Sequence, residues 1–64
     1  MKLKELRIQH NITQLKLAMD LNISQNTVSR YETGERQMGY ETLIAIADYF
    51  DVSLDYLLGR TDKK

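Results

Sequence analysis

Apolar residues recur along the chain at intervals of three and four, the spacing that places them on one face of an α-helix, and no stretch alternates as a strand does. Short polar connections interrupt this periodicity. The pattern predicts helices over about residues 3–10, 14–21, 25–33, 40–50 and 54–58. Short connections between short helices favour an all-α fold, a compact five-helix bundle, over a coiled coil.

Local signals mark where these helices begin and end. Thr13 and Ser24 stand where a side-chain oxygen can accept a backbone N–H of the first turn that follows. Gly34 and Gly59 stand where helices 25–33 and 54–58 should stop. The last helix is expected to begin after either Asp51 or Ser53.

Residues 14–33 form two predicted helices with a tight turn, Leu21-Asn22-Ile23, between them. Such a turn needs a residue that tolerates a positive φ, and asparagine is among the few besides glycine that do. Ala18 is small at the position where two crossing helices approach closely. The residues expected to face inward are Leu17, Leu21, Ile23, Val28 and Tyr31. The segment therefore predicts a helix-turn-helix.

The outward face of helix 25–33 is rich in hydrogen-bonding groups and nearly uncharged; it consists of Gln25, Asn26, Thr27, Ser29 and Arg30. Gln and Asn pair with adenine, Arg pairs with guanine, and Ser or Thr bonds either. The same residues could be ordinary solvated side chains. Within this motif we favour a recognition helix that reads base edges in the DNA major groove.

The chain resembles the phage-repressor and Cro-like helix-turn-helix family, also called the XRE family. The resemblance covers about residues 3–60 and lies in the joint spacing of several motifs. These are Leu6-Arg7, Thr13-Gln14, Leu17-Ala18, Ile23-Ser24-Gln25, Val28-Ser29-Arg30-Tyr31-Glu32 with Gly34, Glu41-Thr42-Leu43, and Val52-Ser53-Leu54-Asp55-Tyr56-Leu57-Leu58. It implies a lambda-repressor-like domain that binds double-stranded DNA.

The resemblance also implies roles for particular residues. The base-contacting positions are Gln25, Asn26, Ser29 and Arg30. The phosphate-contacting positions are Gln14, Ser24, Thr27, Thr33, Arg36 and Gln37. Arg7 and Glu32 match a family pair that forms a buried ion pair, which suits an arginine on an otherwise apolar helix face.

The sequence departs from the family pattern at three places. Asn22 replaces the glycine of the turn, which backbone sterics tolerate. Glu35 falls in the phosphate-facing loop, where a basic residue is commoner, and puts the contacts of that loop in doubt. The segment Gln37–Tyr40 lacks the usual proline, so the start of helix 40–50 stays open.

Length and charge qualify this interpretation. Sixty-four residues allow one domain, 1–64, and the chain has no cysteine. The formal net charge is zero, with nine basic and nine acidic residues, which counts against a nucleic-acid partner. The charges are unevenly distributed, since residues 1–40 carry six basic and four acidic side chains. The local field, not the sum, determines phosphate binding.

Apolar residues beyond the core stripe of helix 40–50 suggest a second buried surface. Leu43, Ile46, Ala47 and Phe50 form the stripe, while Ile44, Ala45 and Tyr49 lie outside it. We expect a homodimer through the C-terminal helices, involving Tyr49, Leu54, Tyr56 and Leu58. The alternative is that Tyr49 and Tyr56 simply lie on the surface.

The remaining expectations are mostly absences. His10 is the only histidine and the acids have no companion nucleophile, so we expect no metal site, no cofactor and no enzyme activity. We expect no secretion signal, no membrane span and no small-molecule ligand, and a cytoplasmic, nucleoid-associated protein. The sequence thus predicts a transcriptional regulator, a repressor that binds a palindromic operator as a dimer. The alternatives are an antitoxin or protein-interaction module on the same fold, and a structural helical domain.

Overall fold

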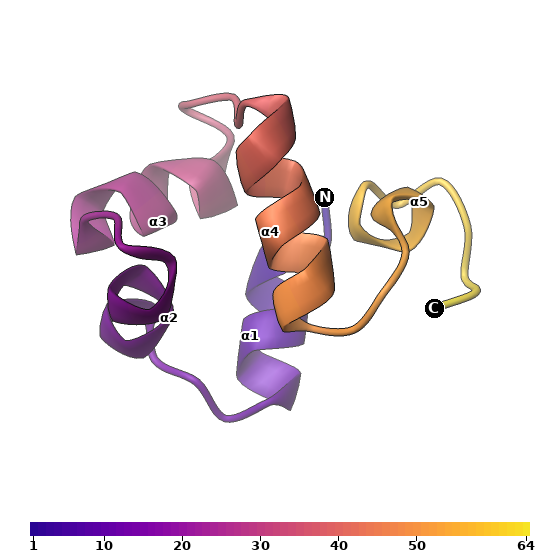
Figure 1. The fold of residues 1–64 in the computed structure, drawn as a ribbon, viewed down its shortest axis with the longest axis horizontal. Helices are drawn as coiled ribbons and strands as arrows, with labels where there is room; N and C mark the ends of the chain where they lie inside the picture. Colours follow the sequence, from indigo (N-terminus) through magenta and orange to yellow (C-terminus); the bar gives the residue numbers. More distant parts are fainter.

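A computed structural model describes residues 1–64, and all of its regular secondary structure is helical. The helices are α1 (Leu3–Gln9), α2 (Gln14–Leu21), α3 (Gln25–Thr33), α4 (Tyr40–Tyr49) and α5 (Leu54–Leu57). Figure 1 shows α2 and α3 together on one side of α1 and α4, with α5 on the other. The expected all-α, five-helix fold is therefore confirmed.

Side-chain caps start three of the helices. Thr13 Oγ1 accepts from Lys16 N at 3.0 Å, Ser24 Oγ accepts from Thr27 N at 3.1 Å, and Ser53 Oγ accepts from Tyr56 N at 3.0 Å. Each bond satisfies a first-turn N–H that has no partner within the helix. Ser53, not Asp51, is thus the cap of α5. Helix α4 begins at Tyr40 after Gly39, without a side-chain cap.

The helix ends are set by residues in the left-handed backbone region. Asn22, with φ 58° and ψ 43°, ends α2 in the tight turn, as its position predicted. Helices α1, α4 and α5 end one residue earlier than predicted, at Gln9, Tyr49 and Leu57. In all three, a residue with positive φ follows one position after the cap: Asn11 at 55°, Asp51 at 55° and Gly59 at 81°. The backbone therefore leaves the helix one residue before the end of each predicted range.

A single cluster of eleven buried residues holds the helices together. Its members are Leu3, Leu6, Leu17, Ala18, Val28, Tyr31, Ile46, Ala47, Phe50, Tyr56 and Leu57. Leu21, Ile23 and Leu43 are half-buried against it. Each of the five helices contributes at least two of the buried residues, so α3 is anchored by the whole domain.

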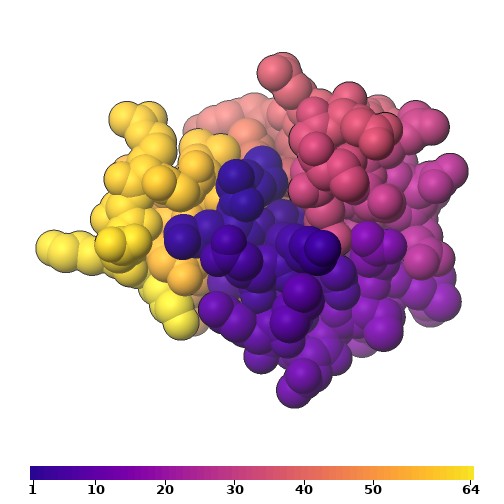
Figure 2. All heavy atoms as spheres, turned by 180° about the vertical axis from the view of Figure 1, so that it is seen from behind, coloured from indigo at the N-terminus to yellow at the C-terminus, as the bar shows by residue number.

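The two ends of the domain are tied by backbone bonds. Lys2 N donates to Leu57 O at 2.8 Å, which joins the segment before α1 to α5. Ser53 N donates to Lys64 O at 2.8 Å. Viewed from behind, the first residues lie between the C-terminal segment and the loop that follows α3 (Figure 2).

Candidate nucleic-acid interface

Helix α3 separates its buried and exposed residues by face. Val28 is fully buried and Tyr31 is 9% exposed, and both belong to the core. Of the predicted base-contacting residues, Gln25, Asn26 and Arg30 are exposed and Ser29 is half-buried. Nine residues at 1.5 Å each give a helix of about 14 Å, and a major groove about 12 Å wide admits such an element.

The first turn of α3 has a compact set of hydroxyls. Ser24 Oγ accepts from Thr27 N, and the two hydroxyl oxygens, Ser24 Oγ and Thr27 Oγ1, lie 2.8 Å apart in a second bond. Both residues are predicted phosphate contacts. Ser24 is exposed and Thr27 half-buried, so the cap leaves this end of the helix open to solvent.

The first turn of α2 also presents donors. Thr13 caps Lys16 N, while the backbone N–H groups of Gln14 and Leu15 donate to no acceptor. Such groups, with the positive end of the helix dipole, favour anions. The side chain of Gln14, a predicted phosphate contact, donates from Nε2 to Glu32 Oε1 at 3.0 Å.

Arg7 and Glu32 are brought together across α1 and α3. Arg7 Nε donates to Glu32 Oε2 at 2.6 Å and Nη2 donates to Oε1 at 3.2 Å, a two-point pairing. The side chains are 13% and 3% exposed, respectively. Arg7 Nη1 also donates to Ile12 O at 2.9 Å, which ties the pair to the loop between α1 and α2.

This environment keeps Glu32 ionised. Burial acts to raise its pKa, but hydrogen bonds from Arg7 and Gln14 and the positive charges of Arg7 and Lys4 outweigh burial, so the pKa lies below its ordinary value of 4.5. The carboxylate therefore links α1, α2 and α3 as an anion at neutral pH.

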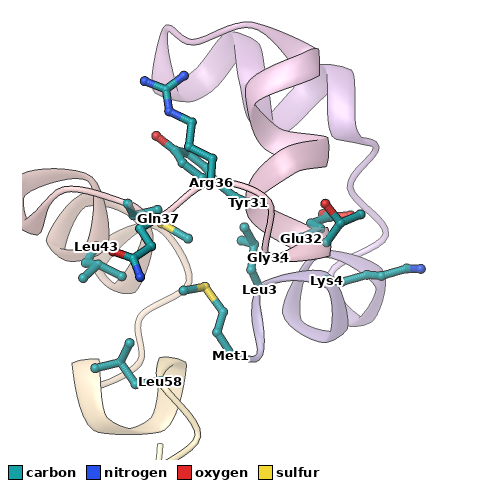
Figure 3. A pocket seen from close by; sticks show the side chains of 12 residues that line it. Met1, Leu3, Lys4, Tyr31, Glu32, Gly34, Arg36, Gln37, Leu43 and Leu58 are labelled. Carbon is teal, nitrogen blue, oxygen red and sulfur yellow. The ribbon is translucent and has the colours of Figure 1, made fainter.

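The loop after α3 carries the last predicted phosphate contacts, Thr33, Arg36 and Gln37, and all three are exposed. The Arg36 guanidinium lies 5.9 Å from the centre of the Tyr31 ring, within the range of a cation–π contact. Figure 3 shows the two side chains close together beside the loop. Thr33 Oγ1 donates to Arg30 O at 3.2 Å, so this hydroxyl is partly engaged within the helix. Glu35, the unexpected acid, is exposed.

A groove of about 490 Å³ opens beside this loop. Its twelve lining residues are Met1, Leu3, Lys4, Tyr31, Glu32, Thr33, Gly34, Arg36, Gln37, Met38, Leu43 and Leu58 (Figure 3). Half of them are apolar.

The two cations of the predicted interface, Arg30 and Arg36, form no internal ion pair. The ion pairs of the molecule are Lys2–Glu5, Arg7–Glu32, Lys16–Asp20 and Arg60–Asp55. Arg30 and Arg36 belong to none of them, so neither guanidinium must break an internal pair to meet a phosphate or a base. Residues 25–39 also contain two acids, Glu32 and Glu35. Because Glu32 is paired with Arg7, the two guanidinium groups are opposed by one unpaired acid, Glu35.

The predicted dimer residues are in different environments. Tyr56 is 9% exposed and belongs to the core of its own chain. Leu54 and Tyr49 are half-buried, and Leu58 is 39% exposed. The exposed apolar residues of α4 are Tyr40 at 70% and Ile44 at 36%.

One contact that joins α2 to α4 was not predicted from the sequence. The hydroxyl of Tyr49 in α4 donates to Asp20 Oδ2 in α2, and Lys16 Nζ lies 3.0 Å from the same carboxylate. The bond from Tyr49 and then that from Lys16 lower the pKa of Asp20, and the same bond to Asp20 raises the pKa of Tyr49 above 10.0. The partners are 29 residues apart, and no local pattern indicates such a pairing.

No three His, Cys, Asp or Glu side chains gather where they could hold a metal ion. None of the helices has the length and apolar character needed to cross a membrane.

Comparison with known proteins adds independent evidence. The family described as "Helix-turn-helix" matches residues 3–57. An uncharacterized HTH-type transcriptional regulator of Bacillus subtilis, YqaE, is 44% identical over 63 residues, which are 97% of this chain and 54% of YqaE. No solved structure matches the chain.

Two other relatives differ in their named roles. The cryptic phage CTXphi transcriptional repressor RstR of Vibrio cholerae is 40% identical over 78% of this chain and 45% of its own length. The antitoxin PezA of Streptococcus pneumoniae is 39% identical over 89% of this chain and 36% of its own length. The chain spans about half the length, or less, of the curated relatives it matches.

Proposed function

Because the chain belongs to the XRE-type helix-turn-helix family of transcriptional regulators, which includes phage repressors, we propose that it is a sequence-specific DNA-binding repressor. The observation that carries the proposal is the exposed face of α3. Gln25, Asn26 and Arg30 face solvent on a helix whose opposite face is buried in the core. Direct reading of base edges needs hydrogen-bonding side chains held on a rigid element.

In this mechanism α3 lies in the major groove and its amides and guanidinium bond base edges. Ser29, half-buried at the same face, contributes its hydroxyl. The phosphate contacts come from Gln14, Ser24, Thr27, Thr33, Arg36 and Gln37. Arg30 and Arg36 supply the only unpaired positive charge at α3 and its loop, so specific hydrogen bonds contribute more than bulk charge, and non-specific affinity is weak.

The dimensions of the domain favour a homodimer. The Cα trace measures 28 × 23 × 19 Å, whereas half-sites one DNA turn apart are separated by about 34 Å. One copy therefore reads one half-site, and a two-fold palindrome requires two copies. The dimer contact involves the exposed apolar residues Tyr40, Ile44 and Leu58, with Leu54 and Tyr49 at its margin.

A dimer that occupies an operator blocks polymerase by occupancy, in the cytoplasm and at the nucleoid. This action requires no cofactor, no bound small molecule and no catalytic group. Whether binding represses transcription depends on where the operator lies relative to the promoter. Nuclease footprinting of the protein on promoter DNA would locate the bound site.

Selection of bound duplexes from a random-sequence pool tests the proposal. Enrichment of a two-fold palindrome is expected, with half-site centres about 10 base pairs apart. Arg30→Ala should relax the preference at one base position at a cost of about 1–3 kcal/mol, and Gln14→Ala should weaken all sites alike. Arg60→Ala is the matched control, since it removes the same charge from an exposed residue outside the interface. If no sequence is enriched, the proposal is wrong.

Sedimentation tests the dimer. The wild-type chain should sediment as a dimer at high micromolar concentration or on the enriched duplex. Leu58→Glu should shift it towards monomer, whereas Met19→Glu, at an apolar residue of α2 that is 69% exposed, should not. A wild-type monomer under both conditions would exclude the homodimer.

An antitoxin or protein-interaction role is the second candidate, and the similarity to PezA favours it. In that role, exposed apolar residues such as Leu15 and Met19 on α2 would contact another protein. Stoichiometric co-purification of a second chain from the native host, with loss of that chain in Met19→Glu, would support it.

A further inference from the structure

Glu32, in the last turn of α3, contacts the first residue of α2. Its Oε1 accepts Gln14 Nε2 at 3.0 Å and Arg7 Nη2 at 3.2 Å, and its Oε2 accepts Arg7 Nε at 2.6 Å. The Glu32 side chain is 3% exposed. The carboxylate therefore lies behind Gln14 and cannot itself meet DNA.

The charge of Glu32 dictates how the Gln14 amide is turned. An ionised carboxylate only accepts hydrogen bonds, so Gln14 must present its NH₂ group to Glu32. One N–H of that group is then used internally. The second N–H of the same nitrogen and the amide oxygen are left for solvent or a ligand, and the half-buried side chain is held by one strong, charge-assisted bond.

We propose that Glu32 is a positioning residue for DNA binding, which holds the amide of Gln14 in the orientation that donates to a backbone phosphate. The inference rests on the proposed function, because it assumes that Gln14 meets a phosphate. An amide held in one orientation loses little conformational entropy when it binds, whereas a free glutamine must be ordered at that moment.

Positioning and simple electrostatics predict opposite effects for the loss of this charge. Glu32 is an acid on the recognition element, so Coulomb repulsion alone predicts that its removal strengthens binding to polyanionic DNA. Positioning predicts that its removal weakens binding, because Gln14 is released. The sign of the change therefore distinguishes the two explanations.

The test is a double-mutant cycle on the affinity for a duplex enriched in the selection described above, using wild type, Gln14→Ala, Glu32→Met and the double variant. Glu32→Met should lower the affinity about 3- to 10-fold, the range expected for one lost hydrogen bond. In the Gln14→Ala background, Glu32→Met should cause no further loss. Glu35→Met is the matched control, since it removes the same charge from an exposed loop residue, and it should leave binding unchanged or strengthen it.

Unchanged or tighter binding by Glu32→Met would overturn the proposal, as would equal losses from Glu32→Met with and without Gln14. Should Glu32→Met fail to fold because Arg7 is left unpaired, the Arg7→Met/Glu32→Met pair replaces it. That pair keeps the net charge at zero, so electrostatics predicts no change and positioning predicts the loss.

NMR of the wild-type chain provides a measurement that needs no DNA. One side-chain amide proton of Gln14 should shift as acid titrates Glu32, while the amide protons of exposed Gln25 should not. Gln14 protons that behave like those of Gln25 at every pH would show that Glu32 does not hold the amide. If wild type binds no duplex, the proposed function itself fails, and the amide shifts still decide whether Glu32 positions Gln14.

Discussion

The Arg7–Glu32 pair offers the sharpest test of what stabilises the domain. Arg7→Met removes the guanidinium from the Glu32 side chain, which is 3% exposed in the intact pair, and leaves Gln14 as the remaining partner of the carboxylate. Breaking a buried pair by removing one member costs about 3–5 kcal/mol, because the other charge is left buried without compensation. The side chains of Arg7 and Glu32 are 13% and 3% exposed, which places the pair nearer to the buried class than to surface ion pairs.

This loss is comparable with the total stability of the domain. At 0.05–0.15 kcal/mol per residue, a 64-residue chain has a free energy of unfolding of about 3–10 kcal/mol. Arg7→Met should therefore be substantially unfolded at 25 °C or have a urea midpoint lower by roughly 3 M, for a slope of about 1 kcal/mol per molar. Replacing both charges, as in Arg7→Met/Glu32→Met, should restore most of the stability, since two apolar side chains can fill the same space.

Urea unfolding followed by circular dichroism at 222 nm measures these differences. Lys16→Met is the control, because the Lys16–Asp20 pair is exposed and its loss should move the midpoint little. If Arg7→Met moved the midpoint no more than Lys16→Met, the pair would behave as a surface ion pair. Leaving Glu32 unpaired would then not cost the ~3–5 kcal/mol expected for a buried charge.

Three further predictions concern the turn, the acid response and the link between α2 and α4. Asn22→Gly should raise the melting temperature and Asn22→Val should lower the stability by about 1–2 kcal/mol, because the residue has φ 58°; equal melting temperatures would contradict this. The pKa of Glu32 is lowered in the folded state, so the stability that its ionised form contributes is present above pH 4.5 and is lost as pH falls through the folded pKa. The urea midpoint of the wild type should fall over that pH range, and the midpoint of Arg7→Met/Glu32→Met should fall less. The bond to Asp20 raises the pKa of Tyr49 above its ordinary value of 10.0. Tyr49→Phe should therefore remove the part of the tyrosinate absorbance change at 295 nm that occurs at the highest pH. Loss of the part that occurs at the lowest pH would refute the bond.

The helix boundaries of the motif could be predicted because they depend on local interactions. Thr13 and Ser24 each bond a backbone N–H three residues ahead, and Asn22 and Gly34 adopt positive φ by their own steric tolerance. Helices α2 and α3 accordingly match the predicted ranges. The ends of α1, α4 and α5 were placed one residue too far, at His10, Phe50 and Leu58, which are the C-caps of these helices. For α4 and α5 the apolar pattern continues into the cap residue.

The surface of α3 could also be predicted, because a residue's position on a helix fixes its face. Burial of Val28 and Tyr31 leaves Gln25, Asn26 and Arg30 outside. The same logic does not determine the side on which Tyr56 lies. In a helix of four residues, periodicity does not tell which side meets the rest of the chain, and packing turned this ring into the core.

The sequence by itself determined the five helices, the turn at Asn22 and the polar outer face of α3, because each follows from interactions within a few residues. Only the tertiary structure decided that Gln14 donates to Glu32, 18 residues away, and that Tyr49 donates to Asp20, 29 residues away. These contacts depend on how separate helices cross, and many residue types at either position are compatible with the helices themselves. The amide orientation of Gln14, and with it the proposed phosphate contact, is therefore a property of the packed domain.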